Sequence, residues 1–168
     1  MTPDRPDMSL LPHWSDRANR LVWLVLLGLT LARTMAVLVS PLGLGVDEAQ
    51  YWLWSETPDF GYFTKPPLTA WIIGAAHWLF GHHEAAVRLP ASWLHLATAV
   101  VLWRCGDWFY GAAAGRVTAL VWISLPATAL GSFLISTDTP LLLTIALASL
   151  ALAAAPSPPR AARPAQQQ

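Results

Sequence analysis

Apolar residues run almost without interruption through four parts of the chain, at about 20–40, 87–104, 115–134 and 139–155. Each run reaches or approaches the ~20 residues that a helix needs to cross a bilayer. The runs are apolar on every side, whereas a barrel strand alternates apolar and polar residues. Because lipid offers no hydrogen-bond partners, helices are favoured, since they satisfy their backbone groups internally. The pattern therefore predicts an all-α integral membrane protein with about four transmembrane helices.

A fifth apolar stretch, 67–80, is too short for the same role. A helix of about fourteen residues extends roughly 21 Å, less than the ~30 Å of hydrocarbon in a bilayer. It contains Trp71 and Trp78, and tryptophan is enriched at membrane interfaces. We therefore expect a juxtamembrane helix at the outer face.

The distribution of basic residues favours the same topology, since positive charge concentrates in cytoplasmic loops. With four crossings and a cytoplasmic N-terminus, only Lys65 and Arg88 lie at the outer face. Apart from Arg33, which lies well inside the first run, the remaining basic residues then all lie on the cytoplasmic side: Arg5, Arg17, Arg20, Arg104, Arg116, Arg160 and Arg163. A crossing by 67–80 would move four of these outside. The same count predicts that the turn "LISTDT" (134–139) lies on the same side as Asp47.

The chain accordingly divides into three parts. Residues 1–19 form a cytoplasmic segment that leads into an uncleaved first helix. Residues 20–155 form the transmembrane domain, whose outer loop, 41–86, carries most of the polar motifs. The Pro- and Ala-rich tail, 156–168, is expected to be disordered.

Composition agrees with a membrane protein and excludes some functions. Hydrophobic residues make up 55% of the chain and charged residues 12%. The net charge is zero, which gives no electrostatic support for binding nucleic acid. The single cysteine, Cys105, allows neither an internal disulfide nor a cysteine-based metal site.

Two adjacent carboxylates, Asp47 and Glu48, follow the first apolar run. Asp47 is interpreted either as a helix N-cap, with Gln50 completing a capping box, or as a carboxylate facing a ligand, and the two readings are compatible. Helical spacing places Asp47, Gln50, Tyr51 and Trp54 on one face, where a sugar-like ligand would meet aromatic rings.

Three basic residues are candidates for binding phosphate. Lys65, in "FTKPPL", is either an interfacial lysine that extends to water or a phosphate ligand held by two prolines. Arg88 is an interfacial anchor, a partner for Glu84 or a ligand. Arg33 lies inside the first apolar run, where a charge marks a functional site unless it extends outward.

The other polar candidates are weaker. Asp138, in "STDTPL", is either an N-cap or a second acidic group of the site. Four histidines fit no zinc spacing and are interpreted as surface or interface groups: His77, His82, His83 and His95.

The ordered motifs resemble a known family. The chain reads "DEAQYWLW", "DFGYFTKPPLTAWIIGAAHWLFG", "AAVRLPA" and then "LISTDTPLLL". This series resembles the bacterial glycosyltransferase family 39-like proteins, relatives of the protein O-mannosyltransferases and of the lipid A aminoarabinose transferases. The resemblance covers roughly residues 20–150 and implies the GT-C membrane fold.

The resemblance implies transfer of a sugar, with inversion, from a polyprenyl-phosphate donor to a lipid or other acceptor at the outer face of the bacterial inner membrane. Asp47 would act at the acceptor, accompanied by Glu48 as the second catalytic residue. Lys65 would lie near the donor phosphate and Asp138 would reach the same cavity. The full set of candidate substrate-binding residues is Lys65, Arg88, Asp138, Tyr51, Arg33 and Tyr62.

Such residue types suit the chemistry. An incoming hydroxyl needs a base, carboxylates stabilise an oxocarbenium-like transition state, and the leaving phosphate needs a cation or a metal. In the aminoarabinose-transferase branch a glutamate precedes the lysine and joins a metal site. Thr64 stands there in this chain, so the sequence assigns no ligands to a possible divalent metal.

Relatives in this family are several times longer. We therefore expect a truncated, N-terminal part of such an enzyme. The alternative is a small non-catalytic membrane scaffold or lipid-binding subunit, which would not need the ordered acidic and basic residues.

Overall fold

A computed structural model of the chain describes residue 12 and residues 16–155. Within this part of the chain the structure is helical, without strands, and residues 1–11, 13–15 and 156–168 lie outside it.

 The cytoplasmic segment and the tail predicted above fall largely on residues outside the described ranges. The helices are α1 (Arg17–Leu38), α2 (Val46–Ser55), α3 (Leu68–Phe80), α4 (Glu84–Tyr110), α5 (Ala112–Ser124), α6 (Pro126–Gly131) and α7 (Asp138–Ala154).

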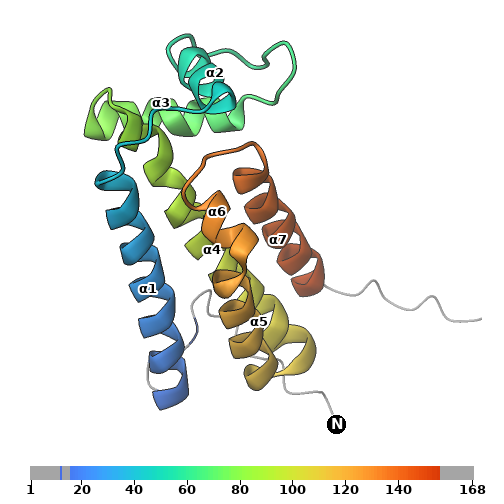
Figure 1. The fold of residues 1–168 in the computed structure, drawn as a ribbon. Coiled ribbons are helices and arrows are strands. Elements are labelled where there is room, and N and C mark those ends of the chain that lie inside the picture. The colour runs from blue at the N-terminus through green and yellow to red at the C-terminus, as the bar shows by residue number, and fades with distance from the viewer. Residues whose placement is uncertain (1–11, 13–15, 156–168) are drawn as a thin grey trace, which may run out of the picture.

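Four of these helices, α1, α4, α5 and α7, have roughly aligned axes, pass alternately up and down, and form a bundle (Figure 1). The helix α3 lies across one end of this bundle, and α2 lies beyond it (Figure 1). The short apolar segment at 67–80 therefore lies across the long helices. This agrees with the prediction, made from its length, that it does not cross the membrane. We call this end of the molecule, formed by α2, α3 and the turn at 132–137, the α2–α3 end.

Within residues 16–155, two helices are long and apolar enough to cross a membrane, α1 with 22 residues and α4 with 27. The helices α5 and α7 are apolar but shorter, so the count of four crossings stays a prediction. Many large apolar side chains on the bundle are exposed, including Leu24, Val121 and Ile145. An exposed apolar surface of this extent is typical of contact with lipid.

The prediction of one continuous helix over 115–134 was wrong. The helix α5 ends at Ser124, and α6 begins at Pro126. Leu125 between them is extended, with φ −60° and ψ 136°. Proline disfavours the helical conformation in the residue before it and has no N–H to donate, so Pro126 ends one helix and begins the next.

Two clusters of buried hydrophobic side chains lie within the described part of the chain. The larger cluster joins α1, α4 and α5 along the bundle: Val22, Leu26, Leu96, Ala99, Trp103, Ala119 and Ile123. The smaller cluster lies at the α2–α3 end and joins α2, α3, α4 and the turn before α7: Tyr51, Ile73, Val87, Ala91 and Ile135. The second cluster fixes the elements that carry the candidate site.

Polar contacts at the end of the bundle opposite the α2–α3 end show which helix ends lie together there. Arg116, near the start of α5, lies 3.3 Å from the Asp16 carboxylate and 3.3 Å from Asn19 Oδ1, both at the start of α1. The start of α1 and the α4–α5 turn therefore share one end of the bundle, as the distribution of arginines predicted.

The helices α4 and α5 approach each other closely at two glycines. A Cβ atom on Gly106 would lie 2.7 Å from the Cα atom of Gly115. A Cβ atom on Gly115 would lie 2.6 Å from the carbonyl oxygen of Trp103 and would also meet the Asp107 carboxylate. A backbone oxygen cannot rotate away, so this contact has no room for a side chain.

We expect Gly115→Ala to destabilise the protein by about 1–3 kcal/mol, the usual cost of overpacking a tight contact. The midpoint of thermal unfolding in detergent micelles measures this. Gly28→Ala is the matched control, because a Cβ atom there meets nothing within 4 Å and alanine favours a helix. Equal midpoints for the two variants would contradict the prediction.

Candidate functional site

The two adjacent carboxylates occupy different environments at the start of α2. The N-cap is Gly45, and Asp47 is the second residue of the helix, so the reading of Asp47 as N-cap was wrong. Glu48 takes the capping role instead, because its Oε2 accepts a hydrogen bond from the Gly45 N–H at 3.0 Å. Asp47 is exposed, and its carboxylate has no hydrogen bond or ion pair within residues 16–155.

Glu48 forms a buried, bidentate ion pair with Arg88 at the start of α4. The Arg88 Nη2 lies 2.7 Å from Glu48 Oε2, and the Arg88 Nε lies 2.9 Å from Oε1. Each side chain is only 3–4% exposed. The sequence had suggested Glu84 as the partner of Arg88, and the structure corrects this to Glu48, forty positions earlier in the chain.

Both members of the pair make further contacts. Arg88 donates to the carbonyl oxygens of Leu42 and Gly43, each at 2.8 Å, and its guanidinium lies 5.7 Å from the centre of the Phe133 ring. The Ile135 N–H donates to Glu48 Oε1 at 3.3 Å. The pair therefore joins the segment between α1 and α2, the start of α2, the start of α4 and the turn before α7.

These contacts determine the charge of Glu48. Burial by itself acts to raise the pKa of a carboxyl group. Hydrogen bonds from Arg88, from the Gly45 N–H and from the Ile135 N–H, together with the charge of Arg88, outweigh burial and lower the pKa of Glu48. Glu48 is therefore ionised at neutral pH and holds no proton to exchange.

The aromatic residues of α2 are largely packed. Tyr51 is buried in the smaller cluster, with its ring 5.9 Å from that of Trp54. Trp54 stacks on Tyr62, with ring centres 4.8 Å apart and planes 9° apart. The Tyr62 hydroxyl lies 2.8 Å from the Trp54 carbonyl oxygen and accepts from the Asp59 N–H at 3.2 Å. Tyr51 and Tyr62 thus hold α2 and the following loop together.

Lys65 lies in the loop that these rings support. Its backbone exchanges two hydrogen bonds with that of Tyr62, each at 3.3 Å, which forms a tight turn just before Pro66 and Pro67. The side chain is half-buried. Its ammonium group has no hydrogen bond or ion pair with any residue of the described part of the chain, so it is available to a ligand.

Asp138 is the first residue of α7, and Thr137 precedes it as the N-cap. Its carboxylate is exposed. The hydrogen bond from Ile135 to Glu48 places the turn before α7 directly beside the start of α2. The structure therefore confirms that the turn carrying Asp138 lies at the same end as Asp47.

Arg33 does not extend toward either end of the bundle. Its Nη2 donates to the Ile123 carbonyl oxygen at 2.7 Å, and its Nη1 lies 3.4 Å from Ser132 Oγ. The carbonyl groups of the last helical turn lack partners within their own helix. Arg33 therefore satisfies a group freed where α5 ends, and it joins α1 to the α5–α6 break.

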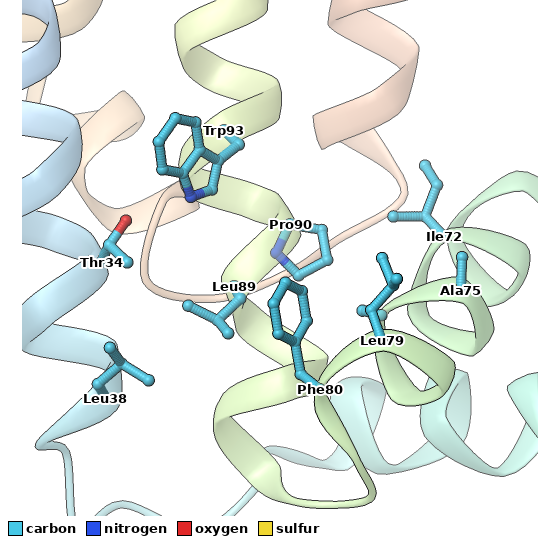
Figure 2. Close-up of a pocket in the computed structure, with 10 residues that line it drawn as sticks. Thr34, Leu38, Ile72, Ala75, Leu79, Phe80, Leu89, Pro90 and Trp93 are labelled. Atoms are coloured by element: carbon cyan, nitrogen blue, oxygen red, sulfur yellow. The ribbon is translucent and has the colours of Figure 1, made fainter.

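An apolar cavity of about 600 Å³ lies between α1, α3 and α4 (Figure 2). Figure 2 shows side chains from all three helices around the same space. Its lining includes Thr34, Leu38, Leu79, Phe80, Pro90 and Trp93. The cavity adjoins the turn of α4 that carries Arg88, because Leu89 and Pro90 belong to its lining.

Sequence reasoning missed a second polar group. Glu56, His77 and His82 lie together at the far end of α2, with their ligand atoms within 4.8 Å of one another. The histidines had been interpreted singly, and a spacing that fits no zinc motif gave no signal that a glutamate from another element would join them.

Comparisons with known proteins show which family the chain is similar to. Residues 64–160 match the family model described as dolichyl-phosphate-mannose-protein mannosyltransferase. The chain is 41% identical over 129 residues to the lipid A galacturonosyltransferase RgtD of Rhizobium johnstonii, an alignment that covers 76% of this chain and 27% of that protein. No solved structure matches the chain significantly.

The family model covers more than half of the chain, so this protein is of the membrane glycosyltransferase class. The chain belongs to the dolichyl-phosphate-mannose-protein mannosyltransferase family, as the resemblance of its motifs implied. It spans about a quarter of the length of the curated relative it matches.

Proposed function

We propose that this chain acts in the transfer of a sugar from a polyprenyl-phosphate donor to a lipid acceptor. The observation that carries the proposal is the exposed Asp47 beside the buried Glu48–Arg88 pair, in a chain of this family. The relative's name makes lipid A the first acceptor and galacturonic acid the first sugar to test. The α2–α3 end faces the outer side of the bacterial inner membrane in this proposal, since the arginine-rich end faces the cytoplasm.

Asp47 is the residue we assign to the acceptor. Its carboxylate is exposed and unpaired among the described residues, so it is free to accept a proton from an incoming hydroxyl or to orient it. Displacement at the anomeric carbon then proceeds with inversion, with the acceptor oxygen and the donor phosphate on opposite sides of the sugar.

Glu48 has a different role from the catalytic one predicted from sequence. It is ionised, nearly inaccessible and bonded to three partners, so acting as a base would require breaking a buried ion pair. We assign Glu48 and Arg88 as positioning residues. They fix the first turn of α2 and hence the direction of Asp47.

Lys65 is the residue we assign to the donor phosphate. Its ammonium group has no partner within residues 16–155, and the turn with Tyr62 and the two prolines restrict its backbone. Positive charge at the phosphate stabilises the leaving group as the sugar departs. The polyprenyl chain would lie in the apolar cavity between α1, α3 and α4.

A transfer assay in detergent tests the proposed function. The full chain is incubated with radiolabelled polyprenyl-phosphate sugars, including galacturonic acid and a neutral hexose, and with lipid A. Label in the lipid A fraction is the expected result. No transfer from any donor would overturn the transferase proposal for this chain and favour the non-catalytic, lipid-binding alternative.

Lys65→Ala is expected to weaken binding of the donor by about 10–100-fold, the worth of a contact to a charged group. Fluorescence titration with a polyprenyl phosphate measures this without requiring turnover. Lys65 is the sole lysine of the chain, so Lys65→Arg is the matched control that keeps the charge. A polyprenol without phosphate should bind the native protein and both variants equally. Unchanged phosphate binding by Lys65→Ala would contradict the assignment.

A further inference from the structure

Three side chains from separate elements meet at the end of α2 that lies away from Asp47. Glu56 is the C-cap of α2, His77 lies in the last turn of α3, and His82 follows α3 in the turn toward α4. Gly81, with φ +89°, reverses the chain between the two histidines. Their rings consequently lie 4.7 Å apart, centre to centre.

The distances match those between ligands of one metal ion. Glu56 Oε1 lies 3.3 Å from His77 Nδ1 and 3.2 Å from His82 Nδ1. Two ligands of a tetrahedral zinc ion, each about 2.0–2.1 Å from the metal, are about 3.3–3.4 Å apart. The arrangement therefore needs little movement to hold an ion.

His77 provides an independent observation. Its side chain is 3% exposed, yet neither ring nitrogen has a hydrogen-bond partner of good geometry among the described residues. Buried polar groups in proteins nearly always have a hydrogen-bond partner or a ligand, so we expect the His77 ring nitrogens to bind one. Burial, followed by the charge of His82, lowers the pKa of His77, and the neutral imidazole is the form that binds metal.

We propose that Glu56, His77 and His82 form a binding site for a divalent transition metal such as Zn²⁺. Two imidazoles and one carboxylate suit zinc, copper or nickel better than magnesium or calcium. Glu56 and His82 are 40% and 62% exposed, so the ion can enter from solvent and keep a water ligand. The bound ion would fasten the end of α2 to α3 and so fix the helix that carries Asp47.

Isothermal titration of the full chain with Zn²⁺ tests this proposal. The protein is solubilised in detergent, carries no polyhistidine tag and is first freed of metal with a chelator. One Zn²⁺ per chain is expected. Glu56→Gln and His82→Asn, both at exposed positions, should each weaken binding at least about 10–100-fold, the loss measured even for outer partners of a metal.

His83→Asn is the matched control. His83 neighbours the cluster but caps α4, accepting a hydrogen bond from the Ala86 N–H, and asparagine preserves a cap of this kind. The His83→Asn variant should bind Zn²⁺ with the same affinity as the native chain. Zn²⁺ should also raise the unfolding midpoint of the native chain and of His83→Asn, but not that of Glu56→Gln. Equal affinity in all four proteins, or no binding by the native chain, would overturn the proposal.

Discussion

Asp47→Asn is expected to lower the rate of sugar transfer by about 10²–10⁴-fold, the usual contribution of a positioned acid or base. Asparagine has nearly the same shape as aspartate but cannot take up a proton. Asp47 is exposed and its carboxylate makes no hydrogen bond or ion pair within residues 16–155, so the fold does not depend on its charge. The loss should therefore appear in turnover at saturating donor, with the unfolding midpoint almost unchanged.

Asp59→Asn provides the control for this measurement. Asp59 is an exposed aspartate of the same outer loop, and its carboxylate accepts from the Phe60 N–H at 2.6 Å, a bond that an asparagine oxygen can also accept. It should transfer sugar at the native rate. If Asp47→Asn matched Asp59→Asn in rate, Asp47 would not be the residue that acts at the acceptor.

Arg88→Ala is expected to destabilise the protein by about 3–5 kcal/mol, the cost of leaving one member of a buried ion pair without its partner. The change leaves the buried Glu48 carboxylate without its counter-ion and the carbonyl oxygens of Leu42 and Gly43 without their donor. The midpoint of thermal unfolding in detergent micelles should fall accordingly.

Two further variants separate this effect from a general loss of charge. Arg116→Ala removes an arginine whose ion pair with Asp16 is partly exposed, and exposed pairs contribute about 0–1 kcal/mol. The double variant Glu48→Gln with Arg88→Met removes both buried charges and should recover part of the stability lost in Arg88→Ala. An Arg88→Ala midpoint no lower than that of Arg116→Ala would show that the pair does not stabilise the α2–α3 end.

The helices themselves were largely predictable. Long apolar runs set α1 and α4, the short run at 67–80 set α3, and prolines and glycines set their limits. The break between α5 and α6 falls at Pro126, a residue that commonly ends a helix. It was not predicted, because the apolar run continues on both sides of this proline. Hydropathy and proline act over a few neighbouring residues, so a single sequence expresses them directly.

The roles of the charged residues were less predictable. The distribution of arginines alone predicted that one end of the molecule carries Asp47, Glu48, Lys65 and Asp138. It could not show that Glu48 lies buried against Arg88, or that Arg33 caps the end of α5. Each of these side chains had a local interpretation that was equally consistent with its neighbours in sequence.

The sequence by itself thus determined the helical membrane character, the crosswise α3 and the end at which the polar motifs gather. Only the tertiary structure decided which carboxylate is free and which is paired, and that Glu56 meets two histidines. The physical reason is that helix formation depends on local composition, whereas the environment of a charge depends on packing between residues tens of positions apart. A buried pair and an exposed carboxylate look alike until the helices that carry them are assembled.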